Sequence, residues 1–342
     1  MLFTPIIGAV YNCIMTEVCL FRNERVISMD SLTLAYRRQT ASSRVRQALK
    51  HNWRLWLLLL PGLIWLVVFC YIPIYGVSIA FKDFNAKLGI MGSPWAGLKY
   101  FEQFFSTSIA MKTITNTLLL SVYSLVFGFP APILFALLIN SLNNLKFKKF
   151  VQTVSFAPHF ISVVVLVSMM SIMMAPSSGF IGVLAKQLTG SEVLFMTRPE
   201  YFRSLYVVSG IWQGMGFSAI VYIAALAGVS PDLHEAAIVD GASKLQRVLH
   251  IDFPSILPTI IIMFILSVGN LFTIGYEKAY LMQNTINTSV SEIISTYVYK
   301  VGLQNAQYSF STAVGLFNSI VNFVLLVVVN TFSRKLSNIS LF

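Results

Sequence analysis

Charged residues are scarce in this 342-residue sequence, at 11% against 56% hydrophobic residues. A globular protein carries about 25% charged residues, so too little polar surface is present to cover a water-soluble particle of this size. The same hydrophobic content excludes a disordered chain. Only three cysteines occur, an odd number that indicates neither a disulfide framework nor a metal site. A polytopic membrane protein is the class that remains.

Sequence signatures of catalysis are also missing. The chain has no G-x-x-x-x-G-K-[ST] phosphate loop and no HExxH metal motif. No Ser/His/Asp set or carboxylate pair falls in a plausible pocket, and the four histidines lack metal-ligand spacing. The sequence therefore predicts neither an enzyme nor a chain with its own ATPase, and uphill transport would need energy from another subunit.

Six long stretches contain no Asp, Glu, Lys or Arg. A helix needs about 20 apolar residues to cross a bilayer, and one central charge would cost about 2.5–3.5 kcal/mol. Each stretch therefore predicts one transmembrane helix, with flanking loop in the longer ones. The stretches are Leu55–Phe81, Thr113–Leu145, Phe150–Ala185, Ser204–Pro231, Phe253–Tyr276 and Val301–Ser333.

The distribution of Lys and Arg over the loops predicts the orientation. With the N-terminus inside, the cytoplasmic side receives 15 basic and 7 acidic residues, and the outer side receives 9 and 6. Basic residues cluster in the N-terminal tail, between spans two and three, after span four and at the C-terminus. Both termini are therefore expected in the cytoplasm.

The segment after span four carries several helix-boundary signals. Ser230 is a good N-cap, and Pro231 suits the first helical position. Gly241 stands where a first short helix would stop, because glycine accepts left-handed backbone angles. A second short helix is expected at residues 242–250, and the prolines that follow mark the start of span five.

Two interpretations fit this segment, which we call the elbow (residues 230–258). Its small residues would let a partner backbone come close, with charged and amide groups beside them for polar contacts. The alternative is an ordinary amphipathic connector between two spans.

The elbow's sequence E-A-A-x-x-x-G-A, followed by I-x-x-P, resembles the EAA loop of permease subunits in bacterial binding-protein-dependent ABC sugar importers. It reads here as residues 235–242 and then Ile251 and Pro254. The similarity runs from about residue 53 to residue 342. It is greatest to the polysaccharide branch, which includes alginate and aldouronate importers. His234 departs from that branch, where tyrosine usually precedes the glutamate, and we expect it to tune the docking surface.

The resemblance implies an all-α polytopic membrane protein with six transmembrane helices, in the type I ABC importer permease fold and the bacterial plasma membrane. Its partners would be a second homologous permease, two ATPase subunits and an extracytoplasmic solute-binding protein. ATP and Mg would be bound by the ATPase, with no cofactor or metal in this chain and no nucleic-acid partner. The residues expected to couple to the ATPase are Glu235, Ala236, Ala237, Asp240, Gly241, Ala242, Lys244 and Arg247.

An oligosaccharide, including an acidic one such as alginate or aldouronate, needs aromatic faces and amide groups along its path. The candidates in spans four to six are Trp212, Gln213, Tyr222, Asn270, Tyr276, Asn318 and Asn322. Alternatives stay open for several of them. Trp212 could be an interfacial anchor. Asn318 and Asn322 lie four residues apart, hence on one helix face, and could bond neighbouring helices.

Two other classes of protein remain possible from the sequence. A stand-alone secondary carrier or channel for a small polar solute would need neither an ATPase nor the elbow. The lack of ionisable groups in the spans argues against proton coupling, although sodium coupling through neutral oxygens remains open. A membrane enzyme or scaffold is disfavoured by the missing catalytic set and by the polar residues in spans four to six.

The expected domains are a cytoplasmic tail at residues 1–52 and the permease domain at residues 53–342. Met1–Leu20 is apolar but lacks a preceding basic region, so it makes a poor signal peptide. We predict that synthesis begins at Met29 and that residues 1–28 are dispensable. N-terminal sequencing of the purified protein tests this, and a chain that begins at Met1 and needs those residues for activity would contradict it.

Overall fold

The computed structural model describes residues 53–337, and the expected tail at residues 1–52 lies outside them. Contacts divide the chain into two units, residues 1–72 and 73–342, each described by itself. In the first unit, α3 (Trp53–Leu66) continues into the π-helical turn η1 (Val67–Tyr71). α3 buries none of its side chains. A helix that is apolar on all sides is typical of a membrane span.

The second unit is built from long helices. Ser108–Asn140 comprises α7 (Ser108–Tyr123), the π-helical turn η3 (Ser124–Gly128) and α8 (Pro130–Asn140), and α12 covers Pro199–Ala227. Lys244–Gly269 joins α14 (Lys244–Arg247), η5 (Val248–Asp252) and α15 (Phe253–Gly269). The last helix, α19, covers Tyr308–Ser337.

Short helices connect these long ones. They are α4 (Ile72–Ile74), which spans the unit boundary, η2 (Tyr75–Phe81), α5 (Gly89–Gly92), α6 (Lys99–Ser106), α9 (Leu145–Phe156), η4 (Ala157–Phe160), α10 (Val163–Met173), α11 (Phe180–Thr189), α13 (Pro231–Val239), α16 (Tyr276–Met282), α17 (Thr288–Ser291), α18 (Ile294–Tyr299) and η6 (Lys300–Gln304). Among the described residues the one β-bridge pairs Lys82 with Trp95.

The all-α prediction is confirmed, and the described helices include five that are long and apolar enough to span a membrane, or six with one bent pair. The bent pair corrects the third expected span, Phe150–Ala185. Leu145–Phe160 and Val163–Met173 meet at 98°. Ser162 caps the second helix by accepting from the Val165 N–H. Pro158, which lacks an N–H, lies in the last turn of the first, so the chain breaks there.

Two further boundaries differ from the expectation. The second helix of the elbow is not separate, because it runs through the π-helical turn η5 into α15, which begins at Phe253. A π-helical turn shifts the hydrogen-bond register, which accommodates Pro254 inside one continuous helix. The sixth long helix begins at Tyr308 rather than Val301, after Ala306 takes a positive φ of 54°.

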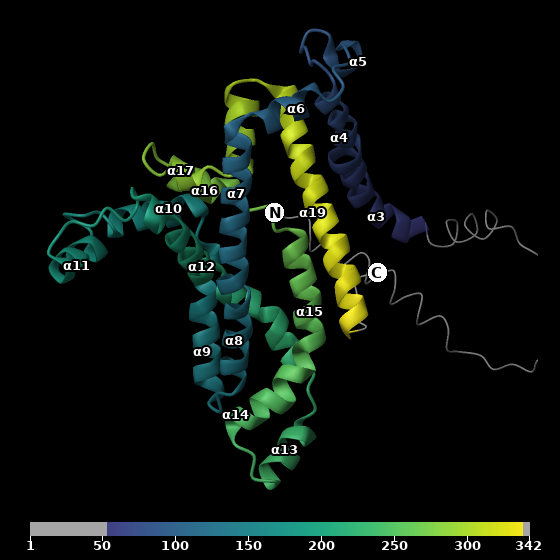
Figure 1. Cartoon of the computed structure of the whole chain (residues 1–342). Coiled ribbons are helices and arrows are strands. Elements are labelled where there is room, and N and C mark those ends of the chain that lie inside the picture. The colour runs from purple at the N-terminus through teal and green to yellow at the C-terminus, as the bar shows by residue number, and fades with distance from the viewer. Residues whose placement is uncertain (1–52, 338–342) are drawn as a thin grey trace, which may run out of the picture. The chain divides into compact units, whose positions relative to one another are not determined.

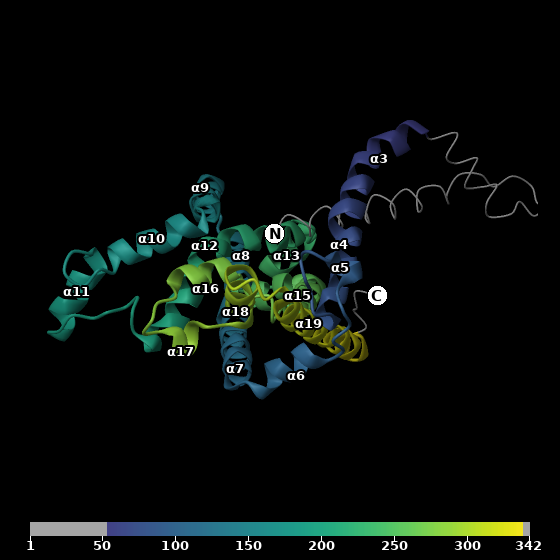
Figure 2. The ribbon, with the colours of Figure 1, turned by 90° about the horizontal axis from the view of Figure 1, so that it is seen from above.

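Helix α12 lies at the centre of the second unit and packs against α8, α9 and α15. One core cluster joins α8, α12 and α15 through Ile133, Ala136, Tyr222, Leu226 and Ile256. In Figure 1, α13 and α14 lie at one end of this unit and α6 lies at the opposite end. α10 and α11 project away from the long helices in both ribbon views (Figures 1 and 2).

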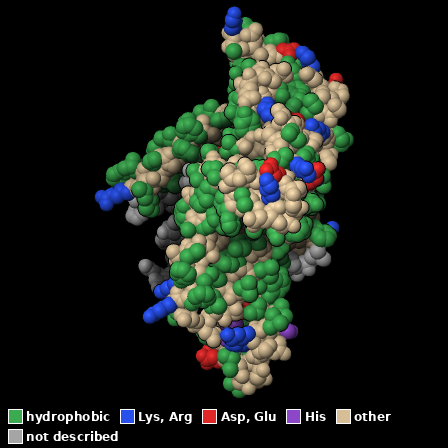
Figure 3. Space-filling view, turned by 90° about the vertical axis from the view of Figure 1, so that its left-hand side faces the viewer, with side chains coloured by type: hydrophobic (Ala, Val, Ile, Leu, Met, Phe, Trp, Pro, Cys, Tyr) green, Lys and Arg blue, Asp and Glu red, His purple; other side chains and the backbone are tan. Residues whose placement is uncertain are grey.

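Hydrophobic side chains cover most of the face seen in Figure 3, and charged ones lie mainly in its upper part and at its lower end. Many large apolar side chains of the long helices are exposed, including Leu134, Val208 and Phe323. Such a surface suits lipid rather than water.

Close packing of α12 against α9 makes one glycine indispensable. A methyl group at Gly216 would overlap the backbone carbonyl of Ser155, whereas one at Gly214 meets nothing within 4 Å. We predict that Gly216→Ala destabilises the protein by about 1–3 kcal/mol through overpacking. Gly214→Ala, the matched control, should leave stability unchanged or slightly raised. Thermal unfolding in detergent measures both, and equal melting temperatures would contradict the prediction.

Candidate substrate pathway and coupling elbow

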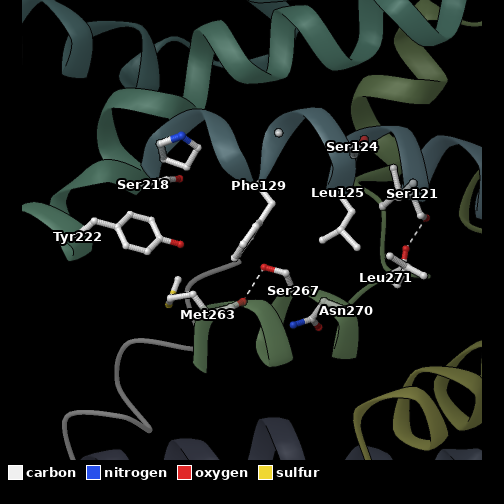
Figure 4. Close-up of a pocket in the computed structure, with 13 residues that line it drawn as sticks. Ser121, Ser124, Leu125, Phe129, Ser218, Tyr222, Met263, Ser267, Asn270 and Leu271 are labelled. Atoms are coloured by element: carbon white, nitrogen blue, oxygen red, sulfur yellow. Dashed lines mark hydrogen bonds between the residues drawn. The ribbon is translucent and has the colours of Figure 1, made fainter. Parts of the chain in front are cut away.

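A cavity of about 350 Å³ lies between the α7–α8 helix, α12 and α15. Figure 4 shows the hydroxyl of Tyr222 directed into the space beside Phe129 and Met263. The lining residues are Ser121, Ser124, Leu125, Gly128, Phe129, Pro132, Ser218, Tyr222, Met263, Ser267, Asn270, Leu271 and Ile274. The wall therefore combines apolar surface with hydroxyl and amide groups.

The hydroxyls of this cavity can still receive a ligand. Ser267 Oγ donates to the Met263 carbonyl at 2.8 Å, and Ser121 Oγ bonds the carbonyls of Thr117 and Leu271. A hydroxyl that donates its one proton keeps lone pairs that accept from another O–H. This chemistry fits a polyhydroxylated solute.

A second cavity of about 190 Å³ adjoins the first, and Ser124, Gly128, Pro132 and Ser218 line both. Its wall on α12 includes Tyr206, Val207, Gly210, Ile211, Gly214 and Met215. The two glycines and Ser218 recur at intervals of four residues, so one small-residue face of α12 runs along both cavities. We call the two cavities the central cavities.

Two of the seven residues predicted for the pathway, Tyr222 and Asn270, line the larger cavity. Sequence reasoning missed the four serines that line the central cavities: Ser121, Ser124, Ser218 and Ser267. Hydroxyl residues inside otherwise apolar spans were the available signal. Serine often bonds its own helix backbone, so that signal alone does not separate a pathway from a satisfied side chain.

Three of the four predicted amides bond backbone groups of other segments, and the fourth, Asn270, donates from Nδ2 to the Leu266 carbonyl of the preceding turn at 3.0 Å. Gln213 Nε2 donates to the Ile161 carbonyl at 2.8 Å, at the break between η4 and α10. Asn322 Oδ1 accepts the Phe272 N–H at 2.9 Å, and Asn318 Nδ2 donates to the Phe272 carbonyl at 3.3 Å. These contacts favour the alternative in which the two asparagines bond neighbouring segments.

The two remaining candidates lie outside the central cavities. Trp212 is 48% exposed on α12. Tyr276 stacks on Tyr299 with ring centroids 5.4 Å apart, and both line a separate cavity of about 480 Å³ with Tyr308.

The first helix of the elbow and its stop have the local structure that the sequence predicts. Ser230 Oγ accepts from the Asp232 N–H and caps α13, which begins at Pro231. Gly241 has φ +78°, in the left-handed region that favours glycine. Ser243 and Gln246 then form a reciprocal capping box at the start of α14.

A polar network ties the elbow to the end of α8 and the first turn of α9. His234 Nε2 lies 3.2 Å from Asp252 Oδ1, and the Asp252 carboxylate is 4% exposed. Asn140 Nδ2 donates to the same oxygen at 3.3 Å, and Lys148 Nζ donates to Asn140 Oδ1 at 3.2 Å. His234, the departure from the family pattern, thus holds α13 against α15.

The predicted coupling residues lie on the elbow with differing exposure. Glu235, Ala236, Asp240, Gly241 and Lys244 are exposed, whereas Ala237, Ala242 and Arg247 are partly buried. Glu235, Lys244 and Arg247 line a cavity of about 450 Å³ with His234 and Asp252. A surface of small residues is therefore open on the elbow, beside a polar hollow.

Helices with an apolar exterior, a polar cavity between them and an exposed elbow define a membrane transport subunit. The family of binding-protein-dependent transport system inner membrane components matches residues 103–338. The chain belongs to this family, which consists of transport permeases rather than enzymes. The predicted family and the predicted fold are thereby confirmed.

Two relatives from Bacillus subtilis (strain 168) are each 41% identical to the chain. They are Protein LplB, over 86% of this chain and 93% of the relative, and the polygalacturonan/rhamnogalacturonan transport system permease protein YteP, over 82% and 88%. A bacterial transporter that imports the acidic polysaccharide alginate is similar in structure, with 37% identity and TM-score 0.79 over 86% of this chain and 99% of that one. A bacterial alginate transporter solved in complex with an alginate pentasaccharide-bound periplasmic protein is also similar. It has 36% identity and TM-score 0.80, over 87% of this chain and 100% of that one.

Filling the central cavities tests whether they carry the solute. Ser218 lines both of them. We predict that Ser218→Leu lowers uptake by about tenfold or more, since a barrier of about 1.4 kcal/mol suffices for that factor. Ser218→Ala, which adds no bulk, should stay near wild type. Uptake into proteoliposomes at equal protein levels measures the difference, and undiminished uptake by the leucine variant would place the path elsewhere.

Proposed function

We propose that this chain is the translocating subunit of an ATP-driven importer whose cargo is an oligosaccharide bearing uronic-acid carboxylates. The observation that carries the proposal is its relationship to a polygalacturonan/rhamnogalacturonan permease and to an alginate importer. Galacturonan and alginate are both polymers of uronic acids. The hydroxyl-lined central cavities add support, because sugar hydroxyls need partners that both donate and accept.

The proposed assembly contains a second homologous permease, two ATPase subunits and an extracytoplasmic solute-binding protein. The family description names dependence on a binding protein. The similar alginate transporter has been solved with a periplasmic protein bound. This sequence has no ATP-binding motif, so ATP and Mg belong on the ATPase partner and this chain needs no cofactor.

The elbow would receive the ATPase motion. Its exposed small residues allow close approach of a partner, and Asp252 fixes it to the start of α15. Binding-protein docking and ATP would shift the populations of an inward-open and an outward-open state. Each can do so only through its differential affinity for the two states.

The proposed location is the bacterial plasma membrane, with both termini in the cytoplasm. The excess of Lys and Arg on one side supports this orientation. Lys148, in the first turn of α9, joins the elbow through Asn140 and Asp252. Two segments assigned to the cytoplasm by charge are therefore held together.

The rival function is a stand-alone carrier or channel. Proteoliposomes that contain this permease, its partner permease and a loaded binding protein decide between them when the ATPase is added or omitted. The proposal requires uptake of an oligogalacturonate or alginate oligosaccharide only with the ATPase and ATP. Uptake without any ATPase would overturn it.

A backbone change at Gly241 tests the elbow separately. Proline fixes φ near −65°, which is incompatible with +78°, and local strain of about 1–3 kcal/mol would displace α13. We predict that Gly241→Pro leaves membrane insertion and ATP hydrolysis largely intact but removes most uptake. Gly190→Pro is the matched control, since Gly190 also has a positive φ of 74° but follows α11. Near-wild-type uptake per ATP in Gly241→Pro would count against a coupling role.

A further inference from the structure

Helix α16 carries a buried lysine whose charge the protein leaves unpaired. Lys278 is 7% exposed. Its Nζ donates to the Tyr206 carbonyl at 2.7 Å and lies 4.7 Å from the centre of the Tyr206 ring. In the part of the chain that the structure describes, no carboxylate lies within ion-pair distance of Lys278.

Burying an ammonium group without a carboxylate partner is unfavourable. It carries three N–H donors, of which the protein uses one in a hydrogen bond. Burial lowers the pKa of Lys278 to about 8 from 10.5, so most of the population stays charged at neutral pH. α16 lies outside the candidate membrane spans. An anion beside this ammonium would therefore offset the cost of its burial.

Lys278 Nζ lies against the wall of the smaller central cavity. The nearest side-chain atom to a Cβ built on Gly210 is Lys278 Nζ, at 3.3 Å. Gly210 and Tyr206, the two α12 residues next to the ammonium, both line that cavity. Because residue 210 has no side chain, the ammonium packs directly against the backbone of the small-residue face of α12, whose other side lines the cavity.

A second cation, Arg203, lies on α12, seven residues before Gly210. Arg203 Nη2 donates to Asn116 Oδ1 at 3.3 Å, and its buried Nε has no hydrogen-bond partner. Residues seven apart share a helix face. Arg203 is near the start of α12 and Lys278 follows the end of α15, whereas the elbow joins the opposite ends of these two helices. Both cations thus lie at the end of the pathway away from the elbow.

We propose that Lys278 and Arg203 form a carboxylate-binding step at this end of the pathway, which receives uronate groups as the oligosaccharide enters the central cavities. This inference rests on the proposed function, since it requires an acidic cargo. A guanidinium can hold a carboxylate through two parallel N–H bonds, and the free ammonium donors of Lys278 can take the same group further in. The alternative is that Lys278 only braces α16 against α12.

The test compares an acidic trisaccharide, trigalacturonate, with its neutral methyl ester. Uptake of each is measured in proteoliposomes that contain the whole complex and saturating loaded binding protein. In Lys278→Gln the side-chain amide can still donate to the Tyr206 carbonyl, but the charge is lost. We expect trigalacturonate uptake to fall about tenfold, the factor for one charge-assisted hydrogen bond, while methyl-ester uptake changes less than about twofold.

Companion variants separate charge from packing. Lys278→Arg should restore most trigalacturonate uptake, and Arg203→Gln should show the same selective loss as Lys278→Gln. Lys186→Met removes an exposed lysine paired with Glu192 and should affect neither sugar. An equal loss for both sugars in Lys278→Gln would assign a bracing role and overturn the inference. Unchanged trigalacturonate uptake would overturn it as well. If the wild-type complex imports neither sugar, the proposed function fails and the inference with it.

Discussion

Side chains of neighbouring helices bond the backbone at three points where helices of the second unit break or end. Backbone polar groups without partners cost several kcal/mol in a bilayer. Gln213 bonds the Ile161 carbonyl at the bent third span, and Asn322 with Asn318 bonds both groups of Phe272 after α15. Asn116 Nδ2 donates to the carbonyls of Ser289 and Glu292 between α17 and α18. The non-helical segments therefore depend on these few amides.

The need to satisfy backbone groups at helix breaks explains why some of the amides predicted to line the pathway bond the protein instead. An amide in an apolar span is equally visible in sequence whether it bonds a sugar or a backbone carbonyl. Tyr222 and Asn270 line the larger cavity, and Asn270 Nδ2 also donates to the Leu266 carbonyl, whereas Gln213, Asn318 and Asn322 bond backbone groups of other segments. The distinction depends on where other helices break, and long-range packing decides that.

Local signals predicted more of the elbow than of the cavities. Ser230, Pro231 and Gly241 act through their own backbone, so the start and stop of α13 could be predicted from sequence. The number and type of the long helices followed from the charge-free stretches. The fusion of α14 with α15 and the kink of the third span could not be predicted from the sequence, because both involve a shift of hydrogen-bond register beside a proline. The Asp252 network links residues more than 100 positions apart and leaves no local pattern.

The unbroken run from Lys244 to Gly269 has a mechanical consequence. It is 26 residues long, which at about 1.5 Å per residue gives a lever of about 39 Å. Its base carries Asp252, and its far arm carries Met263 and Ser267 in the wall of the larger cavity. Tilting the base by a few degrees moves those side chains sideways, so the larger cavity widens or narrows with the helix, and Pro258 is the point between them at which the helix can bend.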